Sequence, residues 1–185
     1  SQPAQALAPQ APSFDPIGNL LTASKIDDQL SALSEEKSLL EPLIQPGTIT
    51  QLVGFNGHGK SIIGLNVGFA LASGTDFGPF RVERESKVLY LDFETPKRTL
   101  LERMASFRLI YGDPSDKLGI WSSSFTREDM SLNTEAGLNL LNCYAEAFKP
   151  DVVVIDTVRS AWPGLEEQSA NAWSGVNRIL KSIRD

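Results

Sequence analysis

The chain has 185 residues, of which 41% are hydrophobic and 22% charged, as is ordinary for a globular domain with a core of its own. Its formal net charge of -6 at pH 7 gives the chain as a whole no positive field for binding nucleic acid. The single cysteine, Cys143, excludes an internal disulfide framework and predicts a reducing, cytoplasmic compartment, and no apolar stretch is long enough to span a membrane.

The first residues have the composition of a linker. Residues 1–16, SQPAQALAPQAPSFDP, are rich in Pro, Ala and Gln, which predicts a flexible, partly extended segment. Residues 17–185 are predicted to form the folded domain. Near the start of this domain, Ile26, Leu30 and Leu33 recur at helical spacing and predict a short helix.

The densest group of glycines is the stretch GFNGHGKS at 54–61. Its spacing, Gly-x-x-x-x-Gly-Lys-Ser, is that of a phosphate-binding loop, and the alternative is an ordinary glycine-rich turn. The preceding residues 48–53, TITQLV, are β-branched and apolar and predict a strand. Residues 62–72 are apolar on every side and predict a buried helix, which Gly74 is placed to end. A phosphate-binding loop requires this order of strand, loop and helix, so the sequence predicts a nucleotide site.

Such a loop binds phosphate through its backbone. Glycines let the chain curl so that successive amide N–H groups point into one concavity, and the following helix adds its unpaired N–H groups. Lys60 is expected to reach the β- and γ-phosphates, and the Ser61 hydroxyl to bind Mg²⁺. His58, the only histidine, is expected to offer its backbone amide and not to act as a base. The predicted nucleotide contacts are Gly54, Asn56, Gly57, His58, Gly59, Lys60, Ser61 and Ile62.

Three further apolar runs predict strands, at 87–94, 118–125 and 151–156. The run at 87–94 is continuously apolar, which suits a strand buried on both faces, as in a parallel sheet. Apolar stripes at helical spacing predict helices around Leu100–Tyr111, Leu138–Phe148 and Trp173–Ile183. Strands that alternate with helices indicate an α/β domain with a mostly parallel sheet and flanking helices.

The strand at 151–156 ends in Asp156. Ligands of open α/β sheets bind at the carboxyl ends of the strands, where this carboxylate would lie. Asp156 is therefore expected to hold the hydrated Mg²⁺ together with Ser61. The alternative is an aspartate at an ordinary junction of strand and loop.

Glu94 ends the neighbouring predicted strand and is expected to orient and deprotonate an attacking water. Glu94 and Lys60 are the predicted catalytic residues. Asp92 is the alternative base, and the non-catalytic interpretation of Glu94 is a solvated residue at the end of a strand. Arg159 either faces a phosphate or makes a structural ion pair.

Four stretches in this order, GFNGHGKS, LASGTDFGPFRV, KVLYLDFET and DVVVIDTVRS, resemble the RecA-like AAA-family ATPases related to the hexameric plasmid replicative helicase RepA. The tail EEQSANAWSGVNRILKSI resembles a helix of the same family. The resemblance implies a P-loop NTPase fold, with Lys60 and Ser61 as the Walker A pair, Asp156 as the Walker B aspartate and Glu94 as the catalytic glutamate. It also implies ATP and Mg²⁺ as cofactors, a homo-hexamer, and movement on single-stranded DNA.

In the family pattern, the chain continues after this last helix into a core strand with a γ-phosphate sensor and into DNA-facing loops. We therefore expect a RecA-like core that lacks its C-terminal strands, with DNA contacts made by segments absent from this chain. The leading interpretation is the motor core of a DNA helicase or of a replication or recombination ATPase. The alternatives are a regulatory or assembly ATPase and a nucleotide-binding interaction module, neither of which needs a nucleic-acid substrate.

Overall fold

The computed structural model describes residues 22–32, 37–55, 57–166 and 170–184, and the chain divides into two compact units, residues 1–36 and 37–185. In the first unit, η1 (Ala23–Lys25) leads into α1 (Ile26–Ala32), which confirms the short helix predicted from apolar spacing. Two acidic residues in the first turn of α1 favour the helix, because negative charge stabilises the positive end of its dipole. The predicted linker, residues 1–16, lies outside the described residues.

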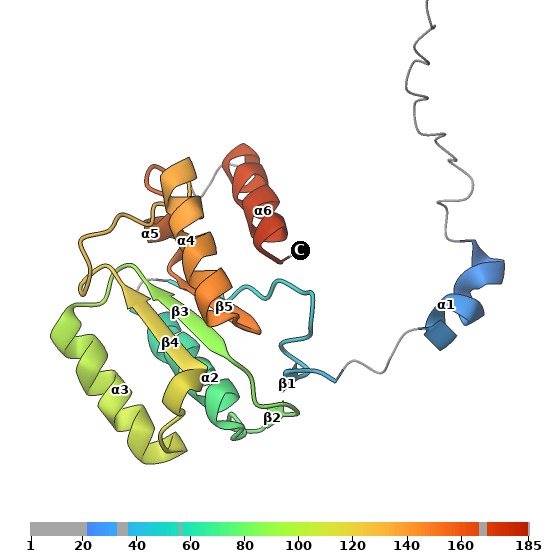
Figure 1. Ribbon diagram of the computed structural model, residues 1–185, viewed down its shortest axis with the longest axis horizontal. Helices are drawn as coiled ribbons and strands as arrows, with labels where there is room; N and C mark the ends of the chain where they lie inside the picture. The colour runs from blue at the N-terminus through green and yellow to red at the C-terminus, as the bar shows by residue number, and fades with distance from the viewer. Residues whose placement is uncertain (1–21, 33–36, 56, 167–169, 185) are drawn as a thin grey trace, which may run out of the picture. The chain divides into compact units, whose positions relative to one another are not determined.

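The second unit is built on a three-stranded parallel sheet (Figure 1). Its strands are β3 (Val88–Asp92), β4 (Leu118–Ser122) and β5 (Val152–Asp156), in the order β4-β3-β5. The central strand β3 is buried along its whole length, which explains why its sequence is a continuous apolar run and does not alternate. The register pairs Asp92 with Ser122 on one side and with Asp156 on the other, so the three strands end together at one edge. The predicted α/β class with a parallel sheet is confirmed.

Helices cover both faces of this sheet (Figure 1). They are α2 (Lys60–Ser73), α3 (Lys97–Tyr111), α4 (Glu135–Phe148), α5 (Val158–Ala161) and α6 (Ala170–Arg184). Residues of α2 and α3 share a buried cluster with Tyr90, whereas α4, α5 and α6 pack with Leu89 and Leu91. This division follows from the strand itself, because successive side chains point to opposite faces of a sheet. Within the described ranges, no helix combines the length and the apolar character needed to cross a bilayer.

Three short elements lie outside the sheet and its covering helices. β1 (Leu40–Glu41) pairs antiparallel with β2 (Arg81–Val82), and η2 (Ser115–Lys117) precedes β4. Leu40 is fully buried and belongs to the same apolar cluster as Leu71 of α2. The small strand pair is therefore held against the core of the second unit.

The strand predicted for residues 48–53 does not form. None of these residues is assigned to a strand, and the segment is exposed, with 52% of Leu52 and 87% of Val53 accessible to solvent. β-branched residues favour an extended backbone, but a strand also needs a partner to complete its hydrogen bonds. Among the described residues, β5 pairs with β3 and not with this segment, so the prediction from local composition was wrong.

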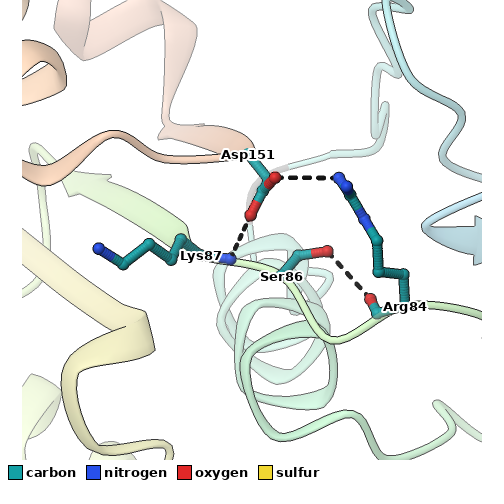
Figure 2. Close-up of polar contacts among 4 residues, drawn as sticks. All are labelled: Arg84, Ser86, Lys87 and Asp151. Atoms are coloured by element: carbon teal, nitrogen blue, oxygen red, sulfur yellow. Dashed lines mark hydrogen bonds and ion pairs between the residues drawn. The ribbon is translucent and has the colours of Figure 1, made fainter.

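A polar cluster fixes the register of β3 and β5 at their amino ends (Figure 2). The Asp151 carboxylate accepts a hydrogen bond from the backbone N–H of Lys87 at 2.8 Å and pairs with the Arg84 guanidinium at 2.9 Å. The Ser86 hydroxyl donates to the Arg84 carbonyl at 3.0 Å. The Lys87 ammonium donates to the carbonyl oxygen of Phe148 at the end of α4, at 3.1 Å. Because the strands are in register from this end, their last residues meet at the other.

Candidate functional site

The glycine loop lies directly before α2. Gly57 and Gly59 have φ angles of 82° and 77°, in the left-handed region that favours glycine. A Cβ atom at either position would meet nothing within 4 Å, so these glycines are required by backbone conformation and not by lack of space. Gly59 is the N-cap of α2, so the unpaired N–H groups of the first helical turn face the loop. Asn56, one of the predicted nucleotide contacts, lies outside the described residues.

Lys60 is the first residue of α2 and reaches back across the loop. Its ammonium donates to the carbonyl oxygens of Gly54 at 2.7 Å and Phe55 at 2.9 Å. His58 packs its ring edge-on against the Phe55 ring, with 5.6 Å between the centroids. Ile62 is 45% exposed on α2. The predicted loop residues that the structure describes are therefore adjacent, and the lysine charge lies within the loop.

Ser61 and Asp156, which are 95 residues apart in the sequence, are brought together at the carboxyl edge of the sheet. The Ser61 hydroxyl donates to Asp156 Oδ1 at 3.0 Å. The Tyr90 hydroxyl donates to the other carboxylate oxygen, Oδ2, at 2.7 Å and lies 3.3 Å from the Ser61 carbonyl oxygen. Both oxygens of Asp156 thus have a hydroxyl donor.

The surroundings of Asp156 disfavour its charge. Burial raises the pKa of the Asp156 carboxyl above its ordinary value, the hydrogen bonds from Tyr90 and Ser61 offset part of this rise, and the nearby charges of Asp92 and Glu94 add to it. Burial also raises the pKa of the Tyr90 hydroxyl, and the charge of Asp156 raises it further. Tyr90 therefore stays protonated and can donate its hydrogen bond across the ordinary pH range.

Glu94 lies two residues beyond the end of β3, and not at its last position as predicted. Its Oε1 accepts hydrogen bonds from the hydroxyls of Thr157, at 2.9 Å, and Ser160. Thr157 directly follows Asp156, and Ser160 lies on α5, so Glu94 and Asp156 occupy the same edge of the sheet.

Asp92, the alternative base, has a different environment. It is 1% exposed, and its Oδ1 accepts the backbone N–H groups of Glu94 at 3.0 Å and Thr95 at 2.8 Å. Its Oδ2 is buried without a hydrogen-bond partner among the described residues. Asp92 thus shapes the turn that carries Glu94, whereas Glu94 itself is exposed to solvent.

Sequence reasoning did not find Tyr90, Thr157 or Ser160. The signal for Tyr90 was a hydroxyl inside an otherwise apolar strand, VLYL, in the same strand phase as Asp92. For Thr157 and Ser160 it was a pair of hydroxyls just after the strand that ends in Asp156. Arg159 lies between them on α5, three residues after Asp156.

One comparison with known proteins found a related family. The family model of the AAA domain matches residues 15–185, a range that includes the glycine loop, Glu94 and Asp156. A comparison with curated proteins found no match. A parallel sheet flanked by helices, together with this family match, supports the P-loop NTPase fold predicted from the sequence.

Proposed function

The chain belongs to the AAA domain family, and from this premise we propose that it is a Mg²⁺-dependent ATPase whose glycine loop binds the phosphates of ATP. The observation that carries the proposal is the contact between Ser61 and Asp156 beside the loop that Lys60 crosses. It joins a phosphate-binding loop to a carboxylate at the edge of the sheet where ligands of α/β proteins bind.

The loop and α2 have the features of an anion site. Backbone N–H groups of the loop and of the first helical turn would donate to phosphate oxygens, and the helix dipole favours negative charge there. Lys60 would exchange the carbonyl oxygens of Gly54 and Phe55 for the β- and γ-phosphates, because charge-assisted hydrogen bonds to phosphate are stronger than those to neutral carbonyls.

Ser61 and Asp156 fit a magnesium ion. They offer a hydroxyl and a carboxylate oxygen, the hard ligands that Mg²⁺ prefers, 3.0 Å apart. Among the described residues there is no cluster of three or more acidic, His or Cys side chains that could hold a metal. Mg²⁺ nevertheless needs only one or two carboxylates when phosphates and waters complete its coordination. When bound, the ion would neutralise charge on the phosphates.

Glu94 would act as the general base. Thr157 and Ser160 hold its Oε1, and a water bound at Oε2 would give its proton to the carboxylate while its oxygen bonds to the γ-phosphorus. The bond from the γ-phosphorus to the oxygen of the leaving ADP would break in the same reaction. Thr157 and Ser160 are thus proposed to orient the base.

Calorimetric titration with ATP tests the binding half of this proposal. Lys60→Ala should lose ATP binding, because the phosphate charge loses its main counter-ion. Lys97→Ala is the matched control, since Lys97 lies on α3 and not on α2. Its ammonium lies over the Phe125 ring, 5.2 Å from the ring centroid. Equal ATP affinity in Lys60→Ala and wild type would contradict the proposal.

The finer assignment rests on the resemblance to the RepA-related ATPases. We propose a DNA helicase or a replication or recombination ATPase that forms a homo-hexamer, acts on single-stranded DNA and is located in the cytoplasm. A regulatory or assembly ATPase and a nucleotide-binding interaction module are the alternatives. Single-stranded DNA should stimulate ATP hydrolysis if the first assignment holds, and hydrolysis that DNA leaves unchanged would favour a regulatory or assembly ATPase. Nucleotide binding without turnover would favour the interaction module.

A further inference from the structure

Tyr90 lies at the centre of the most buried strand, with 1% of its surface exposed. The helix α2 lies close to its ring at two positions that lack side chains. A Cβ atom at Gly64 would lie 3.4 Å from the Tyr90 hydroxyl oxygen, and one at Gly68 would lie 3.7 Å from the ring. A buried phenol hydroxyl is unfavourable unless it is hydrogen-bonded. The group that accepts its hydrogen bond therefore indicates why this position holds a tyrosine and not a phenylalanine.

That partner is the carboxylate proposed to hold Mg²⁺. The Tyr90 hydroxyl donates to Asp156 Oδ2 at 2.7 Å, while Ser61 donates to Oδ1 at 3.0 Å. Two donors on different oxygens fix the plane of the carboxylate. With Oδ2 turned toward Tyr90 in the core, Oδ1 is the oxygen left beside Ser61 at the start of α2.

We propose that Tyr90 is a positioning residue for the cation site: its hydroxyl orients Asp156 so that Oδ1 and the Ser61 hydroxyl face Mg²⁺ together. The proposal rests on the proposed function, because it assigns to Asp156 a role in cation binding. In this role Tyr90 would act through Asp156 and would not itself contact the nucleotide or the cation. A residue that only fills the core would do so equally well as phenylalanine, which has the same ring.

Tyr90→Phe removes the hydroxyl and keeps the ring. Tyr111→Phe is the matched control, because the Tyr111 hydroxyl donates to Asn66 Oδ1 on α2 and its ring packs in the same cluster. Tyr111→Phe loses a hydroxyl contact with α2, whereas Tyr90→Phe loses the hydrogen bond to Asp156 on β5 together with the 3.3 Å contact with the Ser61 carbonyl on α2, so only Tyr90→Phe changes the surroundings of Asp156.

The readout is the gain in ADP affinity when Mg²⁺ replaces EDTA. Groups that orient metal ligands typically contribute about 10- to 100-fold in metal affinity, so Tyr90→Phe should reduce this gain by about tenfold or more. Its ADP affinity in EDTA should match that of the wild type, and Tyr111→Phe should match the wild type in both conditions. Mn²⁺ in place of Mg²⁺ allows the bound cation to be followed directly by electron paramagnetic resonance.

The two proposals fail differently. A wild-type cation gain in Tyr90→Phe would overturn the role of Tyr90 and leave the proposed function standing. A wild-type chain that binds no ADP in either condition would overturn the proposed function. In that case, crystal structures without nucleotide still test the positioning, because the Asp156 carboxylate should turn in Tyr90→Phe, and an unchanged orientation would overturn the inference.

Fluorine labelling tests the same contact without a substitution. The chain has three tyrosines, and 3-fluorotyrosine keeps their hydroxyls. Adding Mg²⁺ to the ADP-bound wild type should move the ¹⁹F resonance of Tyr90 and leave those of Tyr111 and Tyr144 in place. An unmoved Tyr90 resonance, with Mg²⁺ shown to bind, would overturn the inference even if Tyr90→Phe did not fold.

Discussion

Replacing Glu94 with glutamine separates nucleotide binding from hydrolysis. Glu94 Oε1 accepts hydrogen bonds from the hydroxyls of Thr157 and Ser160, and the amide oxygen of glutamine can accept both. The substitution therefore keeps the side chain in place and removes only its charge and its ability to take a proton. ATP should bind with unchanged affinity, because no predicted phosphate contact is altered.

The expected loss of rate follows from the role assigned to Glu94. A positioned general base contributes about 10²- to 10⁴-fold to the rate. Since each tenfold change corresponds to about 1.4 kcal/mol, Glu94→Gln should raise the barrier by about 3–5 kcal/mol. Single-turnover hydrolysis measures this step, and calorimetry measures ATP affinity on the same samples. Glu102→Gln is the control, because its carboxylate pairs with Arg98 on an exposed part of α3.

Wild-type turnover by Glu94→Gln would refute this reasoning and make Asp92→Asn the next test. The structure predicts a different result for that variant. Asp92 is buried, and its Oδ1 accepts two backbone N–H groups of the turn that carries Glu94. Asp92→Asn keeps the Oδ1 acceptor of the turn but buries an amide NH₂ group at the position of Oδ2, which has no hydrogen-bond partner among the described residues, so it should lower the stability of the fold. A slow Glu94→Gln that had also lost ATP binding would refute the separation of binding from chemistry.

Other predictions concern the fold, the loop and assembly. Asp151→Ala should lower the free energy of unfolding by about 1–2 kcal/mol, from a partly exposed ion pair and the lost acceptor of the Lys87 N–H, with unchanged ATP affinity. Gly59→Ala should weaken ATP binding, whereas Gly78→Ala, also at positive φ with nothing within 4 Å, should affect stability alone. Burial raises the pKa of Asp156 in the folded state, so the folded protein binds a proton at this group more tightly than the unfolded chain does. The stability that this group contributes is therefore present at low pH and is lost as pH rises from about 3.9, the pKa in the unfolded chain, through the higher pKa of the folded state. The free energy of unfolding of Asp156→Asn, measured by chemical denaturation, should fall less with rising pH over this window than that of the wild type. An equal dependence on pH in the two proteins would contradict the raised pKa. If the ATP sites lie between subunits of a hexamer, specific ATPase activity should rise with protein concentration as light scattering detects assembly, and a monomer with rapid, concentration-independent turnover would contradict this.

The predictions that succeeded rest on patterns that local sequence encodes. The runs that became β3, β4 and β5 are apolar because a parallel strand is covered on both faces. The meeting of Ser61 with Asp156 was also predictable, because parallel strands present their carboxyl ends at one edge and the loop leads into a helix there.

The contacts that sequence reasoning missed depend on register and packing. Tyr90 reaches Asp156 because β3 and β5 pair in register, which places Asp156 two residues further along the strand direction than the partner of Tyr90. The glycines of α2 leave room for the tyrosine ring. Neither condition can be derived from one strand alone. The segment 48–53 shows the converse, since its composition favours a strand but pairing depends on a neighbour that the described structure does not give it.

The carboxyl edge of the sheet is where this chain departs from what would favour its fold alone. A buried aspartate beside two other acids weakens the folded state, and a hydroxyl inside the central strand needs a partner that phenylalanine would not. Such departures from local consistency are expected at functional sites. Under the proposed function they have one common explanation. Burial is the main cause of the raised pKa of Asp156, and the charges of Asp92 and Glu94, which add to it, would also attract a divalent cation to Oδ1. The Tyr90 hydroxyl would direct that oxygen toward Ser61, so the features that cost stability without nucleotide are the ones proposed to bind Mg²⁺ and ATP.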